Sequence, residues 1–383
     1  MAVKTNYQKN GSNYYRVTAT IGKDASGKPM RKEFYGKSKK EAEAKRDEYM
    51  QSIRSGLALD YREQTLGDLM HLWLFAVVKP TKADNTLSRY MSVFNYVKES
   101  NLYNQRLCDL SSLDFQIYFN DLAASGKTHS QIYMLHKVLK IFFNYCITQR
   151  YILLNPCKGI TIPKTDEPKH EKAVDPFTDD EIKLILDGAK DYMRPLITLA
   201  LATGLREGEL LALTVNDIDL QKNIINVNKA LKVVYEINSD GIGKKVLKIG
   251  DTKTKSSIRS VPIPKNIIPM LKQLSTEQKQ LYFKFGMKEN SPLIFTTPIA
   301  TCIDPKNLQR RWVRLLPRVG VRYRKFHNLR HTYATRLFEA DVNIKTIQTL
   351  LGHSSITITE KTYIHVLNDI KTDAVDKINY MFS

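Results

Sequence analysis

The feature that most constrains the fold is a break in helical patterning near the middle of the chain. Proline removes a backbone donor and clashes with the preceding helical turn, so no regular helix passes through a proline-rich segment. Lysines make the same segment polar, a composition typical of an extended connector. The prolines are Pro156, Pro163, Pro168 and Pro176. We therefore expect an interdomain linker over residues 156–176, between two blocks with separate cores.

The block before the linker reads as a helical bundle over residues 65–155. Thr65 precedes the first apolar run and predicts a helix start. Apolar side chains then recur at helical spacing, which is far more typical of a bundle core than of a cofactor site. These stripes include Tyr90, Val93, Phe94 and Val97, then Phe115, Tyr118 and Phe119, then Val138, Leu139, Phe142 and Phe143. Four to five helices are predicted here.

Residues 1–60 have a different pattern. Two stretches rich in β-formers, residues 14–21 and 30–35, flank a turn-forming segment and predict a hairpin. Ser38 and Glu41 have the spacing of a capping box that opens a helix. A small basic sheet of this kind is either a β-ribbon that enters a DNA groove or a plain structural module.

The block after the linker, residues 177–383, is predicted to be mainly helical with a small hairpin sheet. Thr178 and Glu181 again have capping-box spacing, and an apolar helix ends at Gly204. The β-patterned stretches are residues 223–228, 233–237, 245–249 and 258–262, and a basic helix is expected over residues 306–316. The whole chain is therefore expected to be a multidomain α+β protein.

Charge indicates a polyanionic partner. The 383 residues contain 59 Lys and Arg against 39 Asp and Glu, a net charge of +20. The excess is clustered, since residues 1–40 carry ten basic and two acidic residues, and residues 305–338 carry ten basic and no acidic residues. Such clustering favours a nucleic-acid footprint over a merely basic surface.

The remaining composition points to the cytosol. The four cysteines lie far apart and include no CxxC pair, so reduced thiols are expected instead of a disulfide frame or a zinc site. The polar start lacks the apolar core of a signal peptide. No apolar run approaches the roughly 18–20 residues that span a bilayer. We expect no membrane partner.

Most of the residues suited to catalysis lie between Phe326 and Val366, and Arg206 precedes them in the chain. Arginine holds phosphate oxygens with a planar fork that stays charged, and Arg206 and Arg330 are the candidates. Tyr363 offers a hydroxyl nucleophile, which would store the bond energy as a phosphotyrosyl ester. His327 and His353 can orient oxygens or move protons. No acidic cluster accompanies them, so metal-free attack on a phosphodiester is the first interpretation.

Each of these features has a more ordinary reading. His327 and His331 are four apart, the spacing of two zinc ligands on one helix face. The residue after His327 is Asn328, however, where an HExxH metalloprotease needs Glu, and this disfavours zinc. A lone histidine such as His331 is more often a packing or hydrogen-bonding residue. Tyr363 is one of twenty tyrosines.

The combination is more specific than its parts. Four boxes occur in order: Thr203-Gly204-Leu205-Arg206-x-Gly208-Glu209-Leu210, His327-x-Leu329-Arg330-His331, Leu351-Gly352-His353, and Tyr363. Together they resemble the tyrosine recombinase (phage integrase) family, closely over about residues 175–383. The helical block resembles that family's core-site DNA-binding domain. The N-terminal sheet resembles the arm-site module of integrases from temperate phages and integrative conjugative elements of Gram-positive bacteria.

The resemblance implies a role for each residue. Arg206 and Arg330 would bind the scissile phosphate, and His327 would hydrogen-bond it. His353 would pack near the nucleophile Tyr363. The resemblance also implies that Glu209 supports Arg206, and that Lys253, or alternatively Lys255, protonates the leaving 5′ oxygen from a mobile hairpin. One departure is that His353 and Tyr363 are ten positions apart, where nine is common in the family.

The implied function is site-specific integration and excision of a mobile element, without metal or nucleotide cofactor. The implied partners are core-type and arm-type double-stranded DNA sites, a homotetramer on DNA, and possible excisionase and host DNA-bending proteins. An amphipathic tail over residues 366–381 would dock on a neighbouring protomer. The alternatives are a Xer-like chromosome-dimer resolvase, a type IB topoisomerase, or a non-catalytic DNA-binding regulator.

Overall fold

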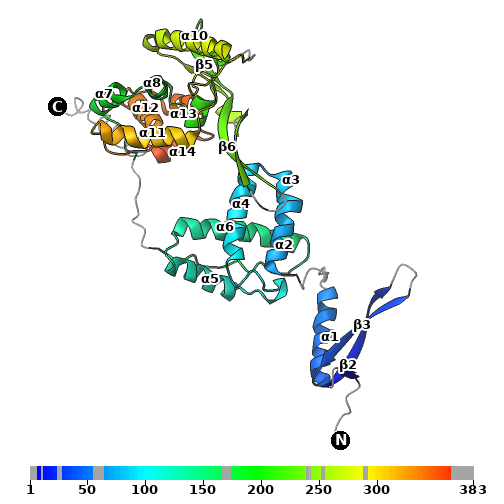
Figure 1. The fold of residues 1–383 in the computed structure, drawn as a ribbon. Coiled ribbons are helices and arrows are strands. Elements are labelled where there is room, and N and C mark those ends of the chain that lie inside the picture. Colours follow the sequence, from blue (N-terminus) through cyan, green and yellow to red (C-terminus); the bar gives the residue numbers. More distant parts are fainter. Residues whose placement is uncertain are drawn as a thin grey trace, which may run out of the picture. The chain divides into compact units, whose positions relative to one another are not determined.

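A computed structural model describes residues 7–9, 12–23, 28–54, 64–165, 174–238, 241, 243–251, 255–287 and 292–363. Contacts divide the chain into two compact units. Unit 1 contains residues 1–168 and 236–243, and unit 2 contains residues 169–235 and 244–383. Helices and small antiparallel sheets occur together, which confirms the predicted α+β fold class (Figure 1).

The N-terminal part of unit 1 is a three-stranded antiparallel sheet covered by one helix. The elements are β1 (Tyr7–Lys9), β2 (Ser12–Lys23), β3 (Pro29–Gly36) and α1 (Lys39–Arg54). Val17 pairs with Phe34 across the hairpin, and Phe34 and Ala42 are buried between the sheet and α1. The backbone N–H of Glu41 donates to Ser38 Oγ at 3.1 Å. The predicted hairpin and capped helix are confirmed.

The second part of unit 1 is a helical bundle, as predicted. Thr65 caps the first helix by accepting a hydrogen bond from the N–H of Asp68 at 3.1 Å. Its core is aromatic, with Trp73 edge-on to Phe142. The main helices are α2 (Leu66–Trp73), which continues into a π-helical turn (Leu74–Val78) and α3 (Lys79–Thr81), then α4 (Asp84–Lys98), α5 (Ser112–Ala124) and α6 (His129–Thr148).

The first half of the proline-rich segment is tied to this bundle. Asn155 donates to the carbonyl oxygen of Lys140 at 3.1 Å. Gln116 on α5 exchanges two hydrogen bonds with the backbone of Thr161, at 2.8 and 3.0 Å. Residues 155–165 are therefore held against α5 and α6, in an irregular conformation that includes a turn over residues 156–159. Residues 166–173 of the expected linker lie outside the described residues.

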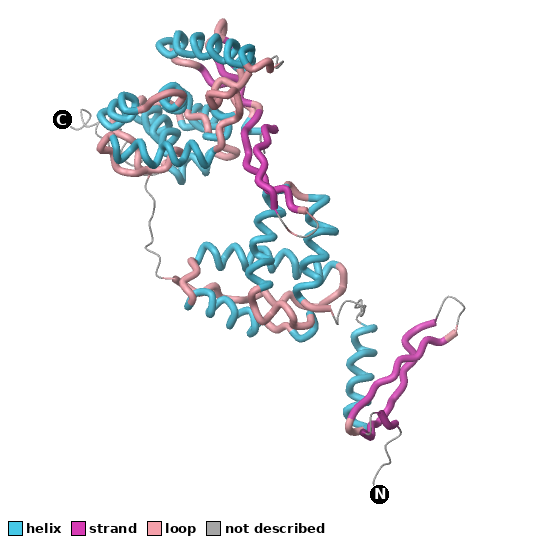
Figure 2. The backbone as a smooth tube through the Cα atoms, viewed as in Figure 1, coloured by secondary structure: helices cyan, strands magenta, loops and turns pink. Residues whose placement is uncertain are grey.

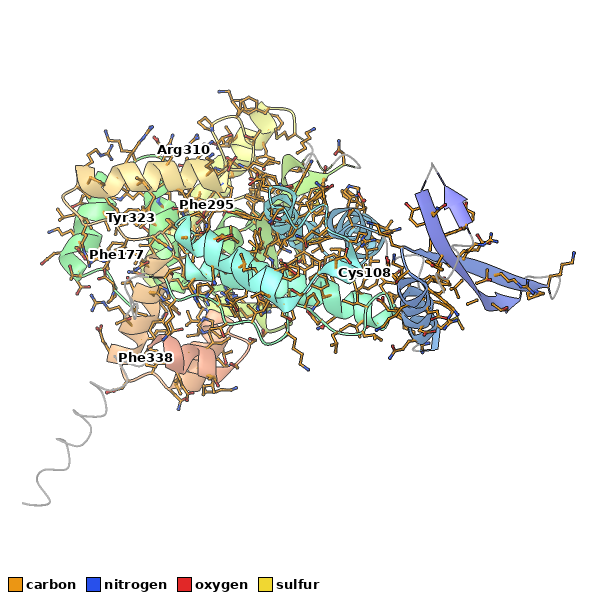
Figure 3. The ribbon with its side chains drawn as sticks, turned by 90° about the horizontal axis from the view of Figure 1, so that it is seen from below. Cys108, Phe177, Phe295, Arg310, Tyr323 and Phe338 are labelled. Carbon is orange, nitrogen blue, oxygen red and sulfur yellow. The ribbon has the colours of Figure 1, made fainter. Side chains whose placement is uncertain are left out.

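Unit 2 is mainly helical. Thr178 caps α7 with the predicted capping box, and Phe177 and Phe326 lie edge-on to Trp312 in the core (Figure 3 labels Phe177). The helices are α7 (Asp179–Gly188), α8 (Met193–Thr203), α9 (Glu207–Leu211), α10 (Ile268–Lys284), α11 (Pro305–Arg318), α12 (Asn328–Glu339), α13 (Ile344–Leu351) and α14 (Ile356–Thr362).

Two small sheets belong to unit 2, apart from residues 236–237 and 243 of the second sheet, which fall in unit 1. One has the strand order β4-β5-β8, with Val227 paired to Arg259. The other is a long two-stranded hairpin (Figure 2). The strands are β4 (Ile218–Asp219), β5 (Ile224–Val227), β6 (Lys229–Ile237), β7 (Gly243–Asp251) and β8 (Arg259–Pro262). The four predicted β-stretches are confirmed within about four residues at their ends.

Three further sequence-based expectations concern residues or side chains that the structure does not describe. Lys253 belongs to residues 252–254, between β7 and β8, and the side chain of Lys255 is likewise not described. The amphipathic tail follows Tyr363, where the description ends. Among the helices that the structure describes, none combines the length and apolar character needed to cross a membrane.

Candidate active site

The candidate site is a cleft of about 610 Å³ in unit 2. Its walls come from the start of α9, from β6, from the segment before β8, from the start of α12, from residues 352–354 after α13, and from α14. Seven of the side chains that line the cleft are charged groups or imidazoles, which can bind phosphate or transfer protons. They are Arg206, Glu209, Lys232, His327, Arg330, His331 and His353. Four sequence-predicted site residues, Arg206, His327, Arg330 and His353, thus meet at one cleft.

Arg206 is positioned by a sharp turn between two helices. α8 ends at Gly204, whose φ of 62° lies in the left-handed region. A Cβ at this position would lie 2.3 Å from the ring of Tyr333, so both conformation and space require glycine. Arg206 then caps α9, and its Nη1 donates to Glu209 Oε1 at 2.8 Å. The predicted glycine bend beside a fixed arginine is confirmed.

Among the described side chains that line the cleft, Glu209 is the only carboxylate, and it is almost completely buried. It pairs with two arginines. Besides Arg206, Arg259 donates to it from both terminal nitrogens, at 2.9 and 3.2 Å. Burial opposes ionisation, but hydrogen bonds and charges from Arg259 and Arg206 outweigh it and lower the pKa of Glu209. Glu209 is therefore an ionised anchor for guanidinium groups.

Arg330 lies in the first turn of α12 and is only 3% exposed. Its Nη1 donates to the carbonyl oxygen of Gly204 at 2.9 Å, and its Nη2 donates to that of Leu351 at 2.5 Å. Burial, followed by the nearby charge of Arg206, lowers the pKa of the Arg330 guanidinium. The side chain is held rigidly by backbone acceptors at the floor of the cleft.

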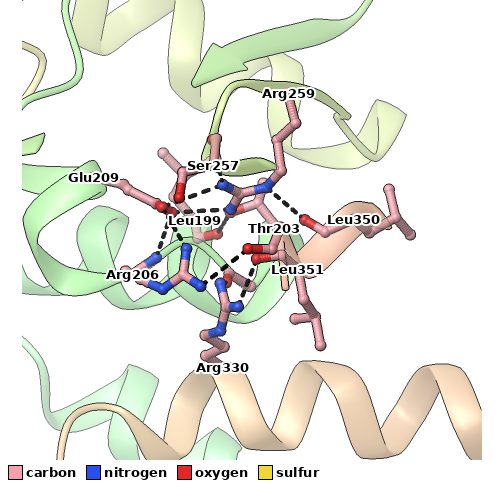
Figure 4. A network of polar contacts seen from close by, with 11 residues as sticks. Leu199, Thr203, Arg206, Glu209, Ser257, Arg259, Arg330, Leu350 and Leu351 are labelled. Atoms are coloured by element: carbon pink, nitrogen blue, oxygen red, sulfur yellow. Dashed lines mark hydrogen bonds and ion pairs between the residues drawn. The ribbon is translucent and has the colours of Figure 1, made fainter. Parts of the chain in front are cut away.

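Arg259 was not predicted as a site residue. It begins β8, and its Nε donates to the carbonyl oxygen of Leu350 at 2.7 Å (Figure 4). Arg206, Arg259 and Glu209 therefore form one network with the end of α13. A single sequence offers no signal for this pairing, because 50 residues separate Arg259 from Glu209.

The histidines of the cleft are held in the neutral form. Withdrawal of the His327 ring from water, together with the charges of His331 and Arg330, lowers its pKa to about 4. The same desolvation, with Arg330 and Arg206, lowers the pKa of His353 to about 4. The Nδ1 of His353 lies 2.9 Å from Thr359 Oγ1. At neutral pH these rings can donate or accept one hydrogen bond at each nitrogen.

Tyr363 ends the described part of the chain in a buried position. Its side chain is 1% exposed and packs with Phe338, Ile347 and Leu351 rather than lining the cleft. Its hydroxyl lies 2.9 Å from Nδ1 of His331. Burial raises the pKa of the Tyr363 hydroxyl above its usual value. His331, expected only as a packing or hydrogen-bonding residue, is the direct partner of the tyrosine.

Neither Lys253 nor the side chain of Lys255 belongs to the described residues. Lys232 on β6 does line the cleft, and its Nζ donates to the carbonyl oxygen of Asp251. In the described ranges there is no cluster of three or more His, Cys, Asp or Glu side chains with metal-binding geometry.

Comparison with known proteins gives consistent results. The family model "Phage integrase family" matches residues 176–369. A "Tyrosine recombinase XerC-like" protein of Caldanaerobacter subterraneus subsp. tengcongensis is 46% identical over 390 residues, covering 100% of both chains. An "Integrase" of Streptomyces ambofaciens is 27% identical over 354 residues, covering 91% of this chain and 88% of the relative.

Solved structures agree on the fold. The Tn1549 transposon integrase in complex with transposon right end DNA has a TM-score of 0.65 at 21% identity, covering 84% of this chain and 100% of that one. A lambda integrase tetramer bound to a Holliday junction has a TM-score of 0.54 at 18% identity, covering 93% and 97%. At these identities the likeness concerns the fold alone.

Proposed function

Because this chain belongs to the phage integrase family of tyrosine recombinases, enzymes that cleave and rejoin DNA strands through a tyrosine, we propose that it integrates and excises a mobile genetic element. The single observation that carries the catalytic part is the meeting of Arg206, Arg330 and neutral histidines at one cleft, with the hydroxyl of Tyr363 bonded to its wall.

We assign the chemical roles as follows. Arg206 and Arg330 hold the non-bridging oxygens of the scissile phosphate, with His327 as a further donor. Tyr363 attacks phosphorus, and its hydroxyl proton passes to a neutral imidazole of the cleft. The P–O5′ bond breaks, and the 5′ oxygen takes a proton from Lys253 or Lys255. The 3′ phosphate remains on Tyr363 until a 5′ hydroxyl of the partner strand attacks it, which reverses these transfers.

The partners follow from strand exchange between two duplexes. Four tyrosines are needed to cleave four strands, so we propose a homotetramer on paired core-type sites, the state of the lambda integrase on its Holliday junction. Excisionase and host DNA-bending proteins are proposed as partners that set direction. Such a protein would work in the bacterial cytosol, on the nucleoid.

The N-terminal sheet supports the mobile-element proposal. Its basic strands present Arg16, Arg31 and Lys32 at exposed positions. Such side chains suit phosphate contact on a second DNA site, so we propose arm-type DNA as the ligand of residues 1–60. Removal of these residues is expected to eliminate arm-site binding and to leave weak core-site binding. Unchanged arm-site affinity in a gel-shift titration would contradict this assignment.

A second candidate is a Xer-like resolvase of chromosome dimers. It is favoured by the full-length, 46% identical relative named XerC-like. Both candidates use the same cleavage chemistry, so only the DNA sites distinguish them.

Mapping covalently trapped DNA in cells separates the candidates, because it reads the cleaved sites directly. Adducts would be recovered from the natural host under denaturing conditions, and the DNA joined to the protein would be sequenced. An integrase is expected to give breaks at both ends of an integrated element and at the joint of its circle. Breaks at one chromosomal locus with no element beside it would instead support the resolvase.

A further inference from the structure

Arg259 is a third arginine at the site. The roles proposed above, in phosphate binding and proton transfer, do not include it. Its side chain is 4% exposed, and it is absent from the cleft wall. It therefore cannot be a direct phosphate ligand in this arrangement. Its contacts instead run to the groups that hold the phosphate-binding residues.

The first of these contacts is the shared carboxylate. Glu209 Oε1 accepts from Nη1 of Arg206 at 2.8 Å and from Nη1 of Arg259 at 3.2 Å. Oε2 accepts from Nη2 of Arg259 at 2.9 Å and from the backbone N–H of Arg206 at 2.9 Å. A two-point contact fixes the plane of the carboxylate as well as its position. Arg206 is more exposed, at 36% of its side chain, so its orientation depends on this anchor.

The second contact is the end of α13. Three consecutive carbonyl oxygens, of Leu350, Leu351 and Gly352, accept hydrogen bonds from Arg259, Arg330 and Arg206 respectively. The C-terminal end of a helix carries partial negative charge from its unpaired carbonyls, which suits a cluster of guanidinium groups. The end of α13 immediately precedes His353, so the same bonds set where that imidazole lies.

The third contact lies on the chain that leads from the lysine-bearing loop. Nη1 of Arg259 donates to the carbonyl oxygen of Ser257 at 3.2 Å, just after the undescribed residues 252–254. Gly352 leaves room for this arrangement, because a Cβ there would lie 3.0 Å from Nη1 of Arg259. One guanidinium thus joins α9, α13 and the start of β8.

We propose that Arg259 is a positioning residue for strand cleavage, which fixes Glu209 and the end of α13 and thereby aims Arg206 at the scissile phosphate. The inference rests on the proposed function. An ordinary buried ion pair would be the alternative, and such pairs often contribute little net stability. If Arg259 only formed such an ion pair, its substitution would have no reason to slow DNA cleavage while leaving DNA affinity unchanged.

The test is single-turnover cleavage of a nicked suicide duplex by Arg259→Lys, which keeps the charge but loses the fork. The duplex carries a core-type site mapped by covalent trapping in cells. The matched control is Arg324→Lys, because Arg324 is 8% exposed and also binds two carboxylates, of Asp175 and Glu181, away from Glu209. Misplacement of Arg206 is expected to slow adduct formation by Arg259→Lys roughly 10- to 100-fold. DNA affinity should stay within about 3-fold of wild type, because it is spread over many phosphate contacts.

A second substrate distinguishes positioning from general damage. With an uncharged methylphosphonate at the scissile position, there is less charge for Arg206 to neutralise. The penalty of Arg259→Lys should then shrink several-fold, whereas a damaged fold would slow both substrates equally. Glu209→Asp, which shortens the shared anchor by one methylene, should reproduce the pattern even if Arg259→Lys folds poorly.

The outcomes are separable. If Arg259→Lys and Glu209→Asp slow cleavage no more than Arg324→Lys, or slow both substrates equally, the positioning role is wrong and the proposed function stands. If wild type binds the duplex and forms no adduct, the catalytic proposal fails and the role of Arg259 fails with it.

Discussion

The hydroxyl of Tyr363 lies 2.9 Å from Nδ1 of His331, and the tyrosine is 1% exposed. Burial and the charge of Arg330 lower the pKa of His331, which favours the neutral ring, and Nδ1 of a neutral ring can accept the hydroxyl proton in this hydrogen bond. The tyrosine is thus hydrogen-bonded and packed against Phe338, with its ring outside the cleft wall. This single contact links the proposed nucleophile to the helix that carries Arg330.

The contact between Tyr363 and His331 should be measurable as a coupling free energy. His331→Leu leaves a buried hydroxyl without an acceptor, and Tyr363→Phe leaves a ring nitrogen without a donor. In a double-mutant cycle, the two changes should be non-additive by about 1 kcal/mol in the free energy of unfolding of unit 2. Tyr282→Phe, another buried tyrosine of unit 2, should be additive with His331→Leu. Additivity in both cycles would show that the contact contributes nothing.

Arg206→Ala and Arg330→Ala should have equal catalytic but unequal structural effects. Both are expected to abolish cleavage and to retain most DNA affinity, since other phosphate contacts remain. Arg330→Ala also leaves the buried carbonyl oxygens of Gly204 and Leu351 without these donors, so it should destabilise unit 2 by about 2–4 kcal/mol. Arg206→Ala should cost about 1 kcal/mol or less, because Arg259 still pairs with Glu209.

Denaturant titration and gel-shift titration check this pair of variants. Complete loss of DNA binding by either variant, with the fold intact, would give the arginine a binding role rather than a catalytic one. Equal stability losses would contradict the burial difference on which the expectation rests.

Gly352→Ala should slow cleavage more than Gly320→Ala, a substitution at a glycine of similar backbone conformation. Gly352 has φ of 66° and Gly320 has φ of 73°, so alanine at either position is strained by roughly 1–2 kcal/mol. Only at Gly352 does the new Cβ meet Arg259, at 3.0 Å, whereas nothing lies within 4 Å of it at Gly320. We expect cleavage to fall at least ~10-fold for Gly352→Ala and to change little for Gly320→Ala. Similar rates for the two variants would contradict the close packing.

His327 and His353 should make the free energy of unfolding depend on pH. Both have a folded-state pKa of about 4, below the ordinary 6.5 of the unfolded chain. The unfolded state therefore takes up protons first as the pH falls. Their stabilising contribution is complete above pH 6.5 and is lost as the pH falls from 6.5 towards 4.

Thermal unfolding between about pH 7 and pH 5 tests this expectation. The midpoint should fall with pH in wild type, and the fall should be shallower in the double variant His327→Asn, His353→Asn. Burial raises the pKa of Glu207, which acts in the opposite direction, so the difference between the two proteins isolates the histidines. Parallel curves would show that the rings titrate normally in the folded state.

What the sequence made predictable is mostly local. The Ser38 cap of α1, the capping box at Thr178 and the glycine end of α8 depend on residues within a few positions of one another, and all are confirmed. The carboxylate of Glu41 accepts from the backbone N–H of Lys37, so only the Ser38 half of that predicted box is confirmed. The arginines and histidines at the cleft were found because the boxes resemble those of a family. Their roles remain proposals.

What the sequence concealed is long-range. Arg259 meets Glu209 across 50 residues, and His331 meets Tyr363 across 32. The acceptors for Arg330 are backbone carbonyl oxygens. Every residue has one, so the residue types in the sequence do not indicate which of them will accept. The anchoring of residues 155–165 on α5 and α6 was not predicted either. Prolines and lysines indicate where helical structure breaks, but they do not indicate which helices the segment contacts.

The most direct test of the account is covalent trapping with wild type and Tyr363→Phe. Each protein would be mixed with a nicked suicide duplex carrying its mapped site, in EDTA, and resolved on a denaturing gel. We expect a protein–DNA adduct with wild type and none with Tyr363→Phe, at equal DNA occupancy. An adduct that survives in Tyr363→Phe would move the nucleophile elsewhere, and absence of an adduct with bound wild type would contradict phosphotyrosyl catalysis by this chain.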